Sequence, residues 1–84
     1  MRSLEMFAMD AIERVRPFLK PEDIQLLEDD FRCGEEEVAL ISALDAAPHL
    51  ITAQDVEDLK RLMKDFYSVD KLLAQHVLDK ALTA

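Results

Sequence analysis

The chain contains a single glycine, Gly34, and only three prolines among its 84 residues. Tight β-hairpins rely on residues that accept a positive φ angle, so a sheet with several hairpins has too few turn residues here. Short joints between helices tolerate that shortage. The apolar residues are mainly Leu, Ile, Val, Met and Ala, with one Tyr, four Phe and no Trp, which favours helix packing over a sheet. We therefore expect an all-α fold.

Apolar residues recur at helical spacing in five segments, which predicts a compact bundle of about five short amphipathic helices. Their expected ranges are 4–16, 21–33, 35–47, 53–66 and 69–82. A chain of this length supports one hydrophobic core, so residues 1–84 are expected to form a single helical domain. The pattern leaves open whether the first helix packs in the bundle or exchanges between chains.

Several residues are typical of helix ends. Ser3 is suited to cap the first helix, and Gly34 stands where a left-handed residue would end the second. Thr52 and Asp55 have the spacing of a capping box at the start of the fourth helix, and Ser68 is expected to cap the fifth.

The same spacing predicts which helix faces are buried. In the third helix we expect Val38, Ile41 and Leu44 to face the core, with Leu40 at the margin. In the fifth helix one face carries five residues that we expect to be buried, with His76 in the core or at its boundary: Val69, Leu72, Leu73, His76 and Val77.

Signs of catalytic or metal chemistry are missing from the sequence. The two histidines are far apart, and Cys33 has no companion at metal-ligand spacing, so no metal site is expected. No glycine-rich turn and no Ser-His or Cys-His arrangement is visible. We expect a protein that is not an enzyme and needs no cofactor.

The formal net charge of −8 argues against nucleic acid or an anionic membrane surface as a partner, since phosphate binding requires clustered Lys and Arg. No apolar stretch approaches the roughly 20 residues of a membrane span. A single cysteine forms no internal disulfide, so an oxidising compartment is not required. These features predict a cytoplasmic protein.

The negative charge is concentrated in the middle of the chain. Residues 1–20 hold three acids and four bases, residues 21–59 hold twelve acids and one base, and residues 60–84 hold three acids and five bases. Glu35 and Glu36 open a helix, where the dipole favours anions. The run from Glu28 to Asp30 ends a helix, where the dipole disfavours them and only Arg32 compensates.

That violation of a local preference suggests a binding role. We expect a partner-binding acidic patch formed by Glu28, Asp29, Asp30, Glu35 and Glu36. The alternative is plain solubilising charge. Tyr67 follows the core residue Phe66 and is expected to point outward, either as an aromatic anchor for a partner or as a boundary residue covering a joint.

The order of features in residues 18–63 resembles small bacterial immunity proteins of polymorphic toxin systems, of the Maf and contact-dependent growth inhibition type. The matching elements are Pro21-Glu22-Asp23, Phe31-Arg32-Cys33-Gly34-Glu35, Ala39-Leu40 and Ile51-Thr52. The resemblance implies a cytosolic protein that binds and neutralises one cognate toxin domain, often a nuclease with a basic active site. No residue role transfers by motif.

The sequence thus favours an immunity protein that occludes a basic toxin domain in a stoichiometric complex, as a monomer. A homodimer is left open. The alternative function is a small acidic adaptor or dimerising regulatory protein that makes contact through an apolar helix face.

Overall fold

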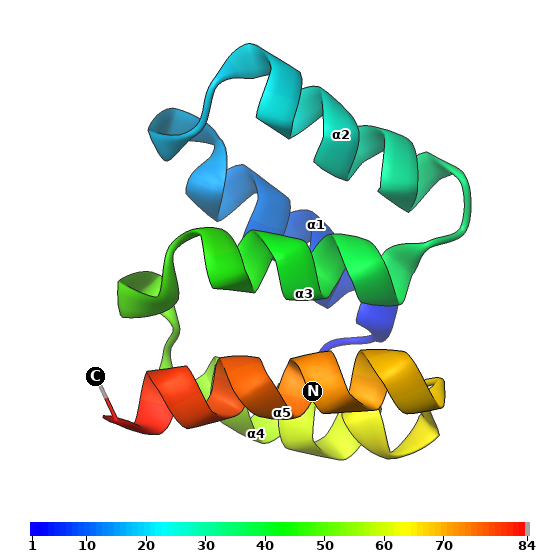
Figure 1. The fold of residues 1–84 in the computed structure, drawn as a ribbon, viewed down its shortest axis with the longest axis vertical. Coiled ribbons are helices and arrows are strands. Elements are labelled where there is room, and N and C mark those ends of the chain that lie inside the picture. Colours follow the sequence, from blue (N-terminus) through cyan, green and yellow to red (C-terminus); the bar gives the residue numbers. More distant parts are fainter. Residues whose placement is uncertain (84) are drawn as a thin grey trace.

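In the computed structural model, which describes residues 1–83, the chain folds into five α-helices joined by short turns (Figure 1). No strand occurs in this part of the chain. The predicted all-α bundle is therefore confirmed. The helices are α1 (Leu4–Val15), α2 (Pro21–Arg32), α3 (Glu36–Ala46), α4 (Ala53–Leu62) and α5 (Ser68–Thr83). Single 3₁₀ turns follow three of them: η1 (Arg16–Phe18), η2 (Pro48–Leu50) and η3 (Met63–Asp65).

The central element is α3, which packs against α1, α2 and α5. Figure 1 shows it across the middle of the molecule, with α2 on one side and the pair of α4 and α5 on the other. Leu40, Ala39 and Ala43 are fully buried. The prediction that Leu40 lies at the margin was wrong, and Val38, expected inside, is only partly buried. A helix with neighbours on several sides has no single inward face.

The first helix belongs to the bundle of its own chain. It packs mainly against α3 and contributes a continuous apolar stripe to the shared core. The buried residues of this stripe are Phe7, Ala8, Ala11, Ile12 and Val15.

Three predicted helix ends are confirmed. The Ser3 hydroxyl accepts a hydrogen bond from the Met6 N–H at 3.1 Å. Thr52 and Asp55 form the reciprocal capping box, with backbone N–H groups donating at 3.1 and 2.9 Å. Gly34 has a φ of 83°, the left-handed conformation that glycine adopts without steric penalty.

Two details near the fourth and fifth helices differ from prediction. The helix expected over 53–66 ends as an α-helix at Leu62, and its last turn tightens into η3, as helix ends often do. Ser68 is the first residue of α5 and not its cap. The Tyr67 carbonyl accepts the N–H of Lys71 at 2.8 Å and so starts the helix one residue earlier.

The buried face of α5 also differs from prediction. The residues that pack inward are Ala74, Val77 and Leu78. Of the predicted face only Val77 is buried, and Val69, Leu72, Leu73 and His76 face solvent. The helix carries two apolar stripes, and the one with the small Ala74 packs against the bundle, because a small residue permits close approach.

Candidate functional site

The acidic patch predicted from the sequence is centred on the turn between α2 and α3. We call Asp29, Asp30, Glu35 and Glu36 the acidic corner. The Glu35 N–H donates to the Asp30 carbonyl at 2.8 Å, and the Gly34 N–H donates to the Phe31 carbonyl at 3.3 Å. This pair of bonds is a Schellman motif, which ends α2 and turns the chain directly into α3. The backbone therefore brings the two acidic runs to one end of the molecule (Figure 1).

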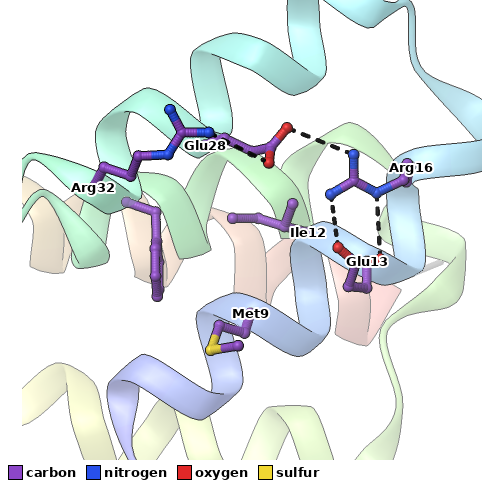
Figure 2. A pocket seen from close by; sticks show the side chains of 7 residues that line it. Met9, Ile12, Glu13, Arg16, Glu28 and Arg32 are labelled. Carbon is purple, nitrogen blue, oxygen red and sulfur yellow. Dashed lines mark hydrogen bonds and ion pairs between the residues drawn. The ribbon is translucent and has the colours of Figure 1, made fainter.

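Glu28 does not point into that corner. It lines an open groove of about 170 Å³ between α1 and α2, whose apolar walls include Met9, Ile12 and Phe31. Figure 2 shows its carboxylate between two guanidinium groups. Arg16 lies 3.5 Å from it and Arg32 lies 3.8 Å from it.

The expectation that only Arg32 compensates the Glu28 to Asp30 run was therefore wrong. Arg16 directly follows α1, and its contact with Glu28 on α2 could not be predicted from the sequence because it depends on how these segments pack. Arg16 also donates two hydrogen bonds to Glu13, which lower the pKa of Glu13. Glu28 thus forms an ion pair that links η1 to α2.

Asp29 and Asp30 face different directions. Asp29 accepts a hydrogen bond from Gln25 at 2.8 Å and lies 3.8 Å from Arg32. Asp30 borders a shallow groove between α2 and α3, beside Ser42. Of the four acids of the corner, Asp29 is paired with Arg32. The other three, Asp30, Glu35 and Glu36, make no ion pair within residues 1–83.

The structure places Tyr67 next to this acidic region. Its backbone N–H donates to the Glu37 carboxylate at 3.2 Å, which fixes the joint before α5 against the start of α3. Tyr67 as a whole is 80% exposed. Partial burial of Glu37 raises the pKa of its carboxyl group, and the nearby carboxylates of Asp70 and Glu35 raise it further.

Glu37 and Asp70 were not among the predicted site residues. They extend the negative surface from the acidic corner to the first turn of α5. Glu37 could have been added because it continues the run of Glu35 and Glu36, but the pairing of α3 with the start of α5 requires the fold.

A second charged cluster, buried between the N-terminal segment and α4, was also missed. Asp55 and Asp58 are 1% and 2% exposed. Arg2 donates to Asp55 at 2.6 Å and to Asp58 at 2.9 Å, and Arg14 also donates to Asp55. The only signal in the sequence was the capping role of Asp55.

This cluster is fully hydrogen-bonded, and no buried side-chain polar atom within residues 1–83 lacks a partner. Burial acts to raise the pKa of Asp55, but the hydrogen bonds from Arg14, Arg2 and Thr52 outweigh it and hold the pKa at about 2. Asp58 has the same balance, and its pKa is also lowered. Both acids stay ionised at neutral pH, so neither is a proton donor there. Their ion pairs with Arg2 hold the N-terminal segment against α4.

The ion pairs distribute the charge of the whole chain unevenly. Cations from outside residues 21–59 pair with four of the twelve acids inside that range. The cations are Arg2, Arg14, Arg16, Arg61 and Lys80, and their partners are Asp55, Asp58, Glu28 and Asp45. Within this range of the described chain, acids without an ion pair remain at the acidic corner, in the first turn of α2 and on α4.

Within the described residues, no group of three or more His, Cys, Asp or Glu side chains is arranged to hold a metal ion. No helix of residues 1–83 combines the length and apolar character needed to cross a bilayer. No family model, no curated protein and no solved structure matches this chain.

Proposed function

We propose that this chain is an immunity-type inhibitor, which binds one basic toxin domain and covers its active site with the acidic corner. The observation that carries the proposal is that the turn between α2 and α3 brings together acids that have no ion pair. Asp30, Glu35 and Glu36 make no ion pair in the described chain, although cations elsewhere in the molecule are engaged with other acids. The immunity-protein resemblance of residues 18–63 points in the same direction.

The proposed mechanism is occlusion by binding alone. A toxin that cleaves nucleic acid attracts phosphates with a positive active site, and a fixed cluster of carboxylates is attracted by the same field. The Schellman turn holds the backbone of the cluster in one place, so little order is lost when the partner binds. Tyr67, beside Glu37, supplies an exposed aromatic side chain at the edge of the contact.

In this proposal the chain acts in the cytoplasm as a monomer in a stoichiometric complex, without a cofactor and without chemistry of its own. Its partner is a protein, because a net charge of −8 repels nucleic acid and anionic lipid surfaces.

A genetic rescue experiment tests the proposal. The C-terminal domain of the protein encoded immediately upstream is expressed from an inducible promoter in a bacterial host, with and without this chain. We expect the upstream domain to stop growth and the chain to restore it. An upstream domain that is harmless, or whose toxicity the chain leaves unchanged, would contradict the proposal.

Charge-reversed variants then test the acidic corner. We expect D30K/E35K to lose protection, and the complex with wild-type chain to weaken as salt rises. The matched control is E22K/E57K, which changes the net charge by the same amount at two exposed sites, one in the first turn of α2 at its opposite end and one on α4. Equal protection by both double variants would show that the corner is not the contact.

One observation favours a second candidate function. The outer face of α5 exposes several large apolar residues, as an adaptor or dimerising regulatory protein would. Sedimentation of the isolated chain distinguishes the two, since self-association through this face supports the adaptor and a monomer supports the inhibitor.

A further inference from the structure

The outer face of α5 carries an apolar stripe that nothing in the bundle covers. We call Val69, Leu72 and Leu73 the α5 stripe. These residues are 67%, 73% and 47% exposed. They stand at i, i+3 and i+4 and so form one continuous surface. His76 continues the same face one turn later and is also exposed.

This stripe is not needed to hold α5 in place. The opposite face, with Ala74, Val77 and Leu78, packs on the bundle. Single exposed apolar residues are common on protein surfaces, but contiguous ones mark contact sites. Tyr67 precedes the stripe and adds an exposed aromatic side chain.

The charges at the two ends of the stripe indicate what covers it. At the Tyr67 end stand the carboxylates of Glu37 and Asp70, with Glu35 close enough to raise the pKa of Glu37. At the other end Lys80 is paired with Asp45 at 2.9 Å. The apolar surface is therefore bordered by two carboxylates at one end and by a neutralised pair at the other. The lysines of this region, Lys60, Lys64 and Lys71, line a groove on the opposite side of α5.

A second copy of this chain fits that pattern poorly. It carries the same net charge of −8, so close approach of two copies is opposed by electrostatic repulsion. A partner with apolar residues along one line and Lys or Arg beside them complements both features. An amphipathic basic helix has this composition and binds by laying its apolar face on a complementary surface.

We propose that the α5 stripe is the apolar centre of the binding interface, and that its occupant is an amphipathic basic helix of the partner protein. The partner's apolar side chains pack on Val69, Leu72 and Leu73, and its cations reach Glu37 and Asp70. The proposal rests on the proposed function for the identity of the partner, and it enlarges the contact from the acidic corner to the whole α3–α5 end.

The probe is a short synthetic helical peptide of leucine and lysine in an amphipathic repeat, and the control peptide has glutamate in place of lysine. Binding is followed by amide chemical shifts and by calorimetry with the full chain. We expect the Leu/Lys peptide to shift the amides of Val69, Leu72 and Leu73 together with Glu37. We expect the Leu/Glu peptide not to bind.

Two variants isolate the apolar contribution. V69Q/L72Q places amides on the stripe and should weaken binding of the Leu/Lys peptide roughly tenfold or more, because apolar burial is lost. The matched control L82Q changes a residue of the same helix that is 61% exposed and lies off the stripe. It should bind as the wild type does.

Two results would overturn the proposal. One is peptide shifts confined to the acidic corner, with an affinity that V69Q/L72Q leaves unchanged. The other is a dimer of the wild-type chain in sedimentation that V69Q/L72Q converts to monomer, since the occupant would then be a second copy.

The rescue experiment separates this inference from the proposed function. If D30K/E35K loses protection while V69Q/L72Q retains it, the inhibitor function stands and the stripe falls outside the interface. If the wild-type chain gives no protection but the peptide maps to the stripe and responds to V69Q/L72Q, the function fails and the basic-helix surface stands.

Discussion

At the scale of single residues, the buried aspartates show how much one position depends on partners that are distant in sequence. The capping role of Asp55 could be predicted, since Thr52 lies three residues before it. Its burial could not, because Arg2 and Arg14 reach it from the N-terminal part of the chain. Asp58 had no local signal at all. Local spacing identifies a cap, whereas an ion pair across elements becomes visible only with the fold.

The lowered pKa of Asp55 predicts acid sensitivity. Its folded pKa is about 2, below the ordinary 3.8, so the folded chain prefers the ionised form. The resulting stabilisation, about 2 kcal/mol, is fully present above about pH 4 and is lost as the pH falls toward 2. Asp58 is shifted in the same direction. Chemical denaturation at a series of pH values should show the free energy of unfolding falling across this window.

The variant D55N provides the check on that assignment. Removing one charge from the cluster leaves Arg2 and Arg14 without their main partner, so we expect a loss of roughly 3 kcal/mol at neutral pH and a weaker acid dependence. D79N, at an exposed helical site bonded to Gln75, should change stability by less than about 0.5 kcal/mol. An acid dependence in D55N as steep as in the wild type would assign the effect to other carboxylates.

At the scale of helices, the five segments could be predicted because capping residues and apolar spacing act locally. Which face is buried could not be predicted for every helix. α5 has two apolar stripes, and hydropathy alone does not tell which one meets α3. The choice depends on the surface that α3 presents, because α5 packs against α3. The same crowding around α3 places Leu40 inside.

The central position of α3 predicts a large effect for a truncation there. Leu40 is fully buried in the core, so L40A removes buried apolar volume and leaves a cavity. We expect a loss of about 3 kcal/mol in the free energy of unfolding, measured by urea denaturation. L26A is the matched control, because Leu26 is 64% exposed on α2. Similar losses for both variants would place Leu40 outside the core.

At the scale of the whole molecule, the candidate site depends on how charge is shared between segments. The sequence located the excess of acids in residues 21–59, and it correctly placed the α2–α3 turn at Gly34. It did not separate Glu28, which forms an ion pair with Arg16, from Asp30, which has no ion pair in the described chain. That separation depends on which helices lie side by side.

The two ends of the acidic corner predict opposite effects of neutralisation on stability. Asp30 lies in the last turn of α2, where the helix dipole disfavours an anion, and Glu36 lies in the first turn of α3, where it favours one. We expect D30N to raise the free energy of unfolding by about 0.5 kcal/mol and E36Q to lower it by a similar amount. Both differences should shrink when denaturation is repeated at high salt.

The same two variants bear on why Asp30 is present. If its charge serves a partner, D30N should be more stable than the wild type and yet protect less well in the rescue experiment. A residue that only solubilises the chain gives a different result, since protection then survives its neutralisation. Increased stability with reduced protection would identify Asp30 as a position where folding is weakened for binding, and loss of stability in D30N would show that the fold itself requires this carboxylate.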